Sequence, residues 1–350
     1  MLILKRLQKY SGRNKNMAIK AETFIVIVTY NSSDFIENCI RSICDSDYKK
    51  WFLAVIDNNS TDGTVKKIQE LKTGNGSCSL DDSNFRLIKL SKNIGFAAGV
   101  NYSVFNLLNK TAIADISGIE YLILINPDLV IEKTSLSNLI RALQKQNEKG
   151  PGACNTGTVG GIIYDYDRKQ IQNAGGLLGD NFVTLHRKNP PGQCHTKESY
   201  VVDYASGALL GMKMEYFKGL GGFDCGYRPL YFEELDFCLK LKKASLFPKI
   251  ATDVIARHFE GASVKKFSNS FYKHYHKNRI RCAIINIAFI DFFKKFIPAE
   301  IKWLKTSATA DQKWPILKAY FLNFVFFLYN LAVRAKNRKI LSNFKMSLND

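Results

Sequence analysis

The chain has 350 residues, 46% hydrophobic and 23% charged, which is an ordinary balance for a folded protein with a sizeable core. Its formal net charge of +19 is uneven: residues 1–20 carry six Lys/Arg and no acid, and residues 265–350 carry seventeen against four acids. Residues 21–264 carry twenty-seven of each sign, and a neutral body with basic ends argues against a nucleic-acid enzyme with a basic cleft.

This charge pattern divides the chain into a basic N-terminal segment (1–20), a body (21–264) and a basic, aromatic-rich extension (265–350). Eight cysteines show neither a Cys-x-x-Cys pair nor zinc-finger spacing, so we expect reduced, mostly packed thiols in a cytosolic protein. The apolar run Leu2-Ile-Leu4 is too short for the core of a secretory signal.

Strands and helices alternate through the first third of the chain. Short apolar runs predict buried strands over 24–28, 51–56, 85–90 and 121–125. Helical spacing predicts a helix capped by Ser32 or Ser33, a second over 64–72, and a third running from the turn at 93–101 toward Leu108. Such alternation predicts an α/β fold with a mostly parallel sheet and helices on both faces.

Polar residues gather where these strands end. They occupy 29–31, 57–59 and 126–128, and a glycine-rich turn over 93–101 joins them. Taken singly each group is explained by turn chemistry, but their repetition at successive strand ends predicts a nucleotide crevice at the carboxyl edge of the sheet. The fingerprints G-x-G-x-x-G and G-x-x-x-x-G-K-[ST] are absent, which excludes a standard dinucleotide-binding oxidoreductase or P-loop ATPase.

The second half of the body adds acids. A strand over 201–205 breaks at Ser206-Gly207, a short helix follows over 213–220, and Glu233-Glu234-Leu-Asp236 opens an amphipathic helix. The helix dipole explains one or two acids in a first turn, but three in four positions exceed what it needs. Like charges this close raise the pKa of one carboxyl, which suits a proton acceptor.

The extension contains a long apolar stretch over 314–333, about the length that spans a bilayer, flanked by the basic run 334–339. Lys318, Asn323 and Asn330 interrupt it. We favour an aromatic-rich helix lying in the interface beside anionic lipid; a single span and a helix packed on protein stay open.

Motifs from 24 to 285 resemble the family 2 inverting glycosyltransferases of the GT-A fold, nearest to the rhamnosyl- and galactofuranosyltransferase-like bacterial enzymes. They are Val28-Thr-Tyr-Asn31, Asp57-Asn-Asn-Ser-Thr-Asp-Gly63, Asn93-Ile-Gly-Phe-Ala-Ala-Gly-Val-Asn101, Asn126-Pro-Asp128, Ser206-Gly-Ala208, Gly221-Gly-Phe-Asp224, Glu233-Glu-Leu-Asp236 and His258-Phe-Glu-Gly-Ala-Ser263.

The resemblance implies that Asp57 accepts the ring N–H of uracil or thymine in a UDP- or dTDP-sugar. It also implies that Asp128 and His258 hold Mg²⁺ or Mn²⁺, with Asn126 in place of the usual first Asp of an Asp-x-Asp metal motif. The nucleotide-sugar site implied in full consists of Thr29, Tyr30, Asn31, Asp57, Asn59, Asn93, Gly95, Phe96, Asn101 and Asn126.

For catalysis, the resemblance implies Glu234 as the general base for the acceptor hydroxyl. Helical spacing puts Glu233 and Asp236 on a different face, where they are structural or orient the acceptor.

The implied acceptor is a glycan, carried on lipid, in cell-surface polysaccharide assembly at the inner face of the cell membrane. Two alternatives stay open: a nucleotidyltransferase acting on sugar phosphates, and an inactive sugar-nucleotide-binding scaffold. Homo-oligomer formation is left open as well.

Overall fold

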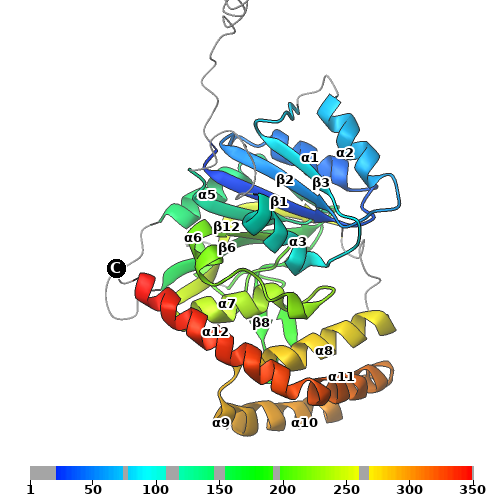
Figure 1. Ribbon diagram of the computed structural model, residues 1–350, viewed down its shortest axis with the longest axis vertical. Helices are drawn as coiled ribbons and strands as arrows, with labels where there is room; N and C mark the ends of the chain where they lie inside the picture. The colour runs from blue at the N-terminus through cyan, green and yellow to red at the C-terminus, as the bar shows by residue number, and fades with distance from the viewer. Residues whose placement is uncertain are drawn as a thin grey trace, which may run out of the picture.

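Ten strands form one mixed sheet in the computed structural model, which describes residues 21–73, 78–107, 118–145, 154–191, 198–259 and 268–348. Helices cover both faces of the sheet, and the C-terminal helices form a further layer along one side (Figure 1). Most of the strands line up in the order β10-β12-β6-β11-β4-β1-β2-β3, while β5 pairs with β12 and β7 with β6.

The first half of the sheet is parallel, as predicted. It contains β1 (Thr23–Thr29), β2 (Trp51–Asp57), β3 (Phe85–Lys89) and β4 (Tyr121–Ile125). Each apolar run forms a strand because side chains on both of its faces are covered by helices. All four carboxyl ends therefore meet at one edge, where Thr29 of β1 lies directly opposite Asp57 of β2.

The second half departs from the predicted parallel arrangement. It contains β5 (Leu129–Ile131), β6 (Asn155–Asp165), β7 (Ile171–Asn173), β10 (Ser199–Val201), β11 (Leu209–Lys213) and β12 (Leu246–His258). The unpredicted strand β11 inserts antiparallel between β4 and β6, and β12 runs parallel to β6 but antiparallel to β5 and β10. A separate hairpin pairs β8 (Gly176–Leu178) with β9 (Thr184–His186).

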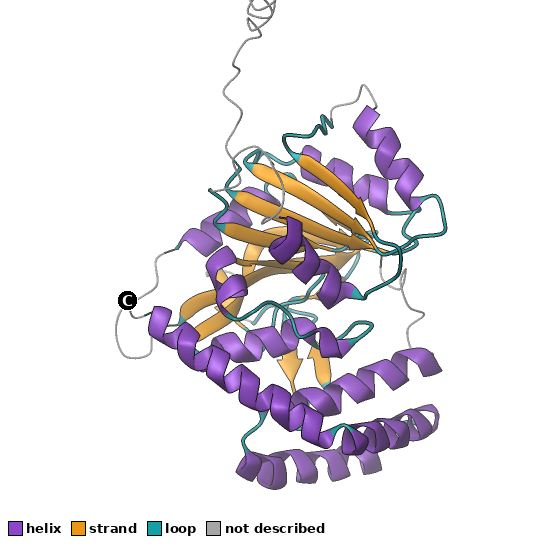
Figure 2. Cartoon of the chain, viewed as in Figure 1, coloured by secondary structure: helices purple, strands orange, loops and turns teal. Residues whose placement is uncertain are grey.

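Helices lie on both faces of the sheet (Figure 2), and two layers of apolar side chains join them to it. In β1, Phe24, Val26 and Val28 face one layer, and Ile25 and Ile27 face the other, because strand side chains alternate. The first layer receives α3 (Phe96–Tyr102), α6 (Met214–Gly219) and α7 (Glu233–Lys243); the second receives α1 (Ile36–Cys44), α2 (Thr64–Thr73) and α5 (Ser135–Gln144).

Two local predictions are wrong. Neither Ser32 nor Ser33 caps α1 through its side chain; the main-chain oxygen of Ser32 accepts from the amides of Phe35 and Ile36, and its own amide donates to Thr64. A disulfide joins Cys44 to Cys78, whereas all cysteines were expected to be reduced. The end of α1 and the chain before β3 bring the two Cα atoms to 5.1 Å, although their spacing in sequence matches no motif.

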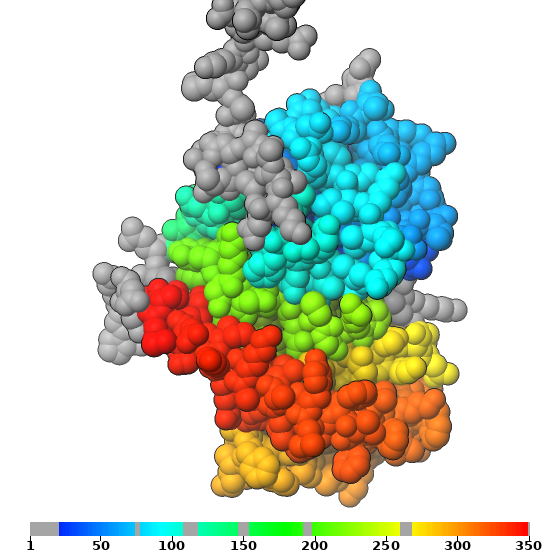
Figure 3. All heavy atoms as spheres, in the orientation of Figure 1, coloured from blue at the N-terminus to red at the C-terminus, as the bar shows by residue number. Residues whose placement is uncertain are grey.

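Five further α-helices lie in the described part of the extension: α8 (Asn269–Asn286), α9 (Phe289–Asp291), α10 (Ile297–Thr306), α11 (Lys313–Val325) and α12 (Phe327–Ser347). In Figure 3 the red end of α12 lies against the green residues of the body. There Phe344 joins the apolar layer and meets the ring of Tyr216 edge-on, with centroids 5.9 Å apart. The predicted stretch 314–333 is therefore split between two helices.

No single described helix has the length and apolar character to cross a membrane. Residues 310–325 and 327–347 meet those two criteria only as a pair, and a bend of 69° separates them. The predicted boundary at 264 and the residues 1–20 lie outside the part of the chain that the structure describes.

Candidate active site

Asp57 and Thr29 place two unpaired oxygen atoms at the carboxyl edge of the sheet. Asp57 Oδ2 accepts from the amide of Ser60 at 3.0 Å. Asp57 Oδ1 and Thr29 Oγ1 are buried and have no hydrogen-bond partner among the described residues. A buried acceptor without a donor is costly, so this edge is suited to a ligand that brings an N–H group.

The loops beside this pair are held by two asparagines with left-handed backbone, Asn31 (φ 50°) and Asn59 (φ 68°). The amide of Asn31 donates to Ser60 Oγ at 2.9 Å, and its Oδ1 accepts from the amide of Thr61 at 2.8 Å. Asn31 thus ties the end of β1 to the loop after β2. Tyr30 is 45% exposed and free to cover a ligand.

The glycine-rich turn lies against the loop after β2, where the amide of Ile94 donates to Asn58 Oδ1 at 3.2 Å. Asn93 Oδ1 accepts from the amide of Gly95 at 2.9 Å. Gly95 has φ 87°, and a Cβ there would lie 2.9 Å from the main-chain oxygen of Pro229, so this close approach requires glycine. The amide of Phe96 donates to that same oxygen at 3.2 Å.

Asn101 lies in α3 and was predicted to bind the nucleotide-sugar, but its side chain hydrogen-bonds to the main chain of Phe223 instead. Its Nδ2 donates to the main-chain oxygen of Phe223 at 2.8 Å, and its Oδ1 accepts from the amide of Phe223 at 2.9 Å. Both ends of the amide are therefore used to hold the chain at 223. Asn126 also works through its main chain, donating from its amide to the oxygen of Ala208 at 2.9 Å.

Asp128 and His258 meet although 130 residues separate them. The end of β12 pairs with β5, which sets His258 opposite Leu129 and leaves its Nε2 3.2 Å from Asp128 Oδ1. Gln172 fixes the imidazole from behind, with its Oε1 3.0 Å from Nδ1 and its Nε2 3.2 Å from the main-chain oxygen of His258. A proton on Nδ1 leaves the Nε2 lone pair directed toward Asp128.

These two residues could supply two of the ligands of a metal ion. Within the described ranges no group of three or more His, Cys, Asp or Glu residues could hold an ion. A carboxylate and an imidazole nevertheless suit Mn²⁺ or Mg²⁺ when diphosphate oxygens and waters complete the shell, which is how such ions usually bind with nucleotides.

The acids at the start of α7 lie in two environments. Glu233 and Asp236 are buried, whereas Glu234 is partly exposed. The carboxyl of Glu234 accepts from the amide of Gly207. Burial raises the pKa of Glu234, and it raises the pKa of Glu233 well above its usual range, with the charge of Glu234 as a second cause. The expected repulsion is present, but withdrawal from water is the larger effect.

Asp236 is a structural residue in this arrangement. Its Oδ2 pairs with Lys240 at 2.7 Å, with both side chains buried, and its Oδ1 accepts from Asn286 of α8 at 2.6 Å. Tyr231 was not predicted. Burial and the charges of Glu233 and Glu234 raise the pKa of Tyr231 to about 12.

Main-chain contacts bring the separate motifs into one place. Gly207 contacts Glu234, and the next residue, Ala208, accepts from Asn126, two positions before Asp128. Gln172 and Tyr231 were missed by sequence reasoning, because nothing in a three-residue strand or in the residues before a helix marks them as part of a site.

Part of the chain is similar in sequence to known proteins. Residues 24–194 match the sequence model of "Glycosyl transferase family 2". The chain is 20% identical over 259 residues to "Rhamnosyltransferase WbbL" of Escherichia coli (strain K12), covering 74% of this chain and 91% of that protein. It is 22% identical over 260 residues to the "N-acetylglucosaminyl-diphospho-decaprenol L-rhamnosyltransferase" of Mycobacterium tuberculosis, covering 73% of this chain and 81% of that protein.

Solved structures share the fold. GalNAc-T7 with UDP, GalNAc and Mn²⁺ gives a TM-score of 0.57 at 15% identity over 78% of this chain, which spans about half (48%) of that protein's chain. The mannosyltransferase PcManGT from Pyrobaculum calidifontis with GDP-Man and Mn²⁺ gives a TM-score of 0.52 at 15% identity, covering 93% of this chain and 85% of that chain. S. aureus TarS 1–349 with UDP-GlcNAc gives a TM-score of 0.52 at 15% identity, covering 93% of this chain and 89% of that chain. The predicted GT-A-like fold is therefore confirmed.

The two acidic environments predict opposite effects of neutralisation on stability. A raised pKa means that the folded state keeps the proton of Glu234 to higher pH than the unfolded chain, so this stabilisation is present at low pH and lost as pH rises. Glu234→Gln should therefore be at least as stable as wild type at pH 8, with a smaller difference at pH 4.

Asp236→Asn is the matched comparison, because it leaves Lys240 buried without its partner. We expect it to lose about 3 kcal/mol at pH 8. Urea unfolding of both variants at the two pH values tests this. A Glu234→Gln protein that is clearly less stable than wild type at pH 8 would contradict the assigned environment.

Proposed function

Because residues 24–194 of this chain match the sequence model of the family 2 glycosyltransferases, we propose that the protein transfers a sugar from a UDP- or dTDP-sugar, with inversion and with a divalent metal, to a glycan acceptor carried on lipid. The observation that carries the proposal is that Asp128 and His258 meet at the sheet edge while main-chain contacts lead from there to Glu234. A nucleotidyltransferase is less favoured, because Thr29-Tyr-Asn-Ser32 is not a basic, glycine-rich phosphate loop.

The base of the nucleotide would bind at the Asp57 edge. Uracil and thymine both carry a ring N–H between two carbonyl oxygens, and Asp57 Oδ1 is a buried acceptor lacking a donor. Asp57 ends β2, which is paired on both sides, with β1 and with β3, and this would make the contact rigid. The main-chain turns at Asn31 and Asn93 would flank the nucleotide, and Tyr30 is exposed beside it.

Asp128 and His258 would hold the metal, with Gln172 keeping the imidazole in the tautomer that offers Nε2. The ion supplies Lewis-acid charge stabilisation to the leaving nucleoside diphosphate. Of the structures that share the fold, those of GalNAc-T7 and PcManGT contain Mn²⁺.

Glu234 would act as the general base. Inversion by single displacement needs a carboxylate that takes the proton of the acceptor hydroxyl on the face opposite the leaving group. Glu234 is partly exposed, its orientation is fixed by the Gly207 amide, and its raised pKa strengthens it as a base near neutral pH. Glu233 and Asp236 are buried and would support it.

The rhamnosyltransferase relatives guide the choice of substrates. We propose a deoxyhexose donor such as a rhamnosyl nucleotide and an acceptor sugar linked through diphosphate to a polyprenyl lipid. The mycobacterial relative's name specifies an acceptor of that kind.

A donor panel tests the proposed activity and the metal together. Full-length protein should release nucleoside diphosphate from one donor of a UDP- and dTDP-sugar panel with Mn²⁺ or Mg²⁺, and EDTA should abolish the release. Asp128→Ala and His258→Ala should lose metal-dependent donor binding, measured by calorimetry, with an unchanged melting temperature. Normal turnover after EDTA treatment would refute the metal site, and no turnover with any donor and acceptor would refute the activity.

Removal of the base should act on the rate. Glu234→Gln should lower kcat by about 10²–10⁴-fold with donor affinity nearly unchanged, because the proton acceptor is lost while the nucleotide edge is intact. The acidic limb of the wild-type kcat profile should lie above the usual glutamate pKa, since that of Glu234 is raised. If Glu233→Gln is the inactive variant and Glu234→Gln keeps its activity, the assignment is wrong.

We also propose that the extension docks on an anionic membrane at the cytoplasmic face. Large apolar side chains are exposed around the bend between α11 and α12, among them Phe321 (66%), Phe324 (80%) and Leu328 (79%). The basic residues of 334–339 follow directly, and each basic residue near such a surface contributes about 1 kcal/mol. The Cys44–Cys78 disulfide does not support a cytoplasmic location, because thiols there are normally kept reduced.

Liposome flotation checks the docking surface. Full-length protein should float with vesicles containing anionic lipid, and less so at high salt. The double variant Phe324→Glu/Leu328→Glu should stay in the bottom fraction of the gradient, because it replaces two of the exposed apolar side chains with charged ones. Leu185→Glu, a matched change at a 63% exposed apolar residue of the body, should float like wild type. Equal flotation of all three proteins would contradict the proposal.

A further inference from the structure

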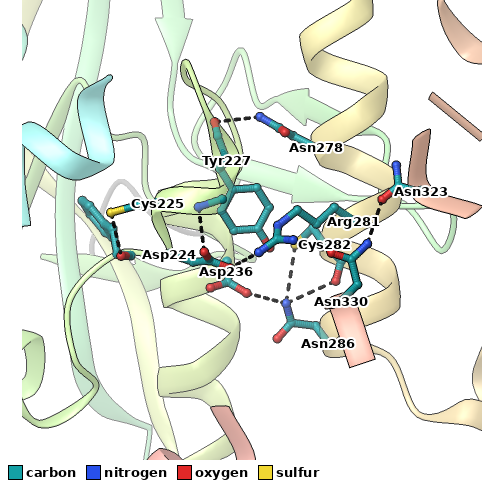
Figure 4. Close-up of polar contacts among 12 residues, drawn as sticks. Asp224, Cys225, Tyr227, Asp236, Asn278, Arg281, Cys282, Asn286, Asn323 and Asn330 are labelled. Carbon is teal, nitrogen blue, oxygen red and sulfur yellow. Dashed lines mark hydrogen bonds and ion pairs between the residues drawn. The ribbon is translucent and has the colours of Figure 1, made fainter. Parts of the chain in front are cut away.

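The segment 224–232 leads directly into the acid pair and is held by a residue of the extension. Asn278 of α8 is fully buried, and its Nδ2 donates to three main-chain oxygen atoms of this segment. The distances are 2.9 Å to Tyr227, 2.9 Å to Leu230 and 3.1 Å to Tyr231. Figure 4 shows the side chain of Asn278 pointing from α8 toward Tyr227.

These three contacts precede an unfavourable backbone conformation. Tyr231 (φ 78°) and Phe232 (φ 80°) are consecutive non-glycine residues in the left-handed region. Bulky side chains rarely adopt it, and such residues persist only where their surroundings hold them. Glu233 follows at once as the first residue of α7, so the direction in which Glu233 and Glu234 leave the loop depends on this turn.

The same segment also contacts the nucleotide side of the crevice. The main-chain oxygen of Pro229 accepts from the amide of Phe96, next to Gly95. One loop therefore touches the glycine-rich turn on one side and the proposed base on the other. Its position sets the relation between the two halves of the site.

The α8 helix is itself fixed by buried polar contacts (Figure 4). Arg281 pairs with Asp224 at 2.6 Å, lies over the ring of Tyr227 at 5.3 Å, and donates to Asn330 of α12. Asn286, the last residue of α8, donates to Asp236 of α7. Asn278 thus belongs to a helix that is rigidly joined to α7 and to the last helix of the chain.

We infer that Asn278 is a positioning residue for sugar transfer and that the C-terminal extension completes the active site through it. The inference rests on the proposed function, because it concerns the placement of Glu234. The hydrogen bonds that Asn278 makes among the described residues go to the main chain of 227–231 and to none of the residues proposed to bind the nucleotide, so its loss should alter the transfer step and leave nucleotide binding intact. A residue that only stabilises the fold would lower both together or neither.

Two variants of the full chain test this inference. Asn278→Ala removes the donor, and Asn278→Asp keeps the volume but sets an acceptor against three carbonyl oxygens. Asn323→Ala is the control: Asn323 is also a buried asparagine of the extension, donates to the oxygens of Lys277 and Ala319, and accepts from Asn330. None of these hydrogen bonds, among the residues described, reaches 224–232 directly. The measurements are kcat for transfer, the Kd of the nucleoside diphosphate, and hydrogen exchange of 224–236.

We expect both Asn278 variants to lose about 10²-fold in kcat, the effect of displacing a catalytic group by about 1 Å, with Kd changed less than about twofold. Exchange in 224–236 should rise in them and not in Asn323→Ala. Normal kcat in either Asn278 variant, an equal loss of kcat in Asn323→Ala, or parallel loss of nucleotide binding would each overturn the inference. A wild-type protein that uses no donor overturns the proposed function itself.

Discussion

The antiparallel pairing of β5 with the end of β12 is the constraint on which the candidate site depends. It sets His258 opposite Leu129 and hence beside Asp128, across 130 residues of sequence. A slip of one residue would turn His258 to the other face of the sheet, so the register must be fixed elsewhere. The long pairing of β12 with β6 fixes it, and Gly161 permits an irregular approach there: a Cβ would lie 2.4 Å from the oxygen of Val254.

Around this constraint the site keeps several polar groups in unfavourable surroundings. Asp57 Oδ1, Thr29 Oγ1 and Glu233 Oε2 are buried without a partner among the residues described, and each such group costs about 1–3 kcal/mol. The two apolar layers of the sheet offset this cost. Groups of this kind are held ready for a ligand because the strands under them cannot relax, so binding completes hydrogen bonds that folding left open.

Sequence reasoning predicted the strands that are buried on both faces, because a continuous apolar run such as Ile25 to Val28 has few other uses. It made no prediction for β5, for β7 or for the eleven-residue strand β6. It also missed β11 and the hairpin of β8 and β9, which are five and three residues long and carry no periodicity. Asp57, Asp128, His258 and Glu234 were found through motifs, and the structure brings them to one edge. Their assigned roles stay predictions.

What the sequence could not supply are contacts between distant segments. Asn101 lies in a motif associated with nucleotide binding, yet both ends of its amide hold Phe223. Gln172 and Asn278 belong to no motif, and their importance comes only from the atoms they meet. The disulfide between Cys44 and Cys78 was missed for the same reason, since a spacing of 34 residues does not reveal that the two chains run close together.

The extension contributes residues to the core and also has an exposed apolar surface. Arg279 and Glu300 form a buried pair inside it; burial alone would raise the pKa of Glu300, but the guanidinium of Arg279 holds it below its usual value. Phe344 packs into the body, and Asn278 holds the loop before the acid pair. Because these helices are anchored to the body, the position of the extension fixes the position of the loop before the acid pair. If the bend between α11 and α12 rests on a lipid surface, the contacts through α8 fix the distance of Glu234 from that surface. An acceptor sugar attached to a lipid would then reach Glu234 at a fixed distance from the lipid.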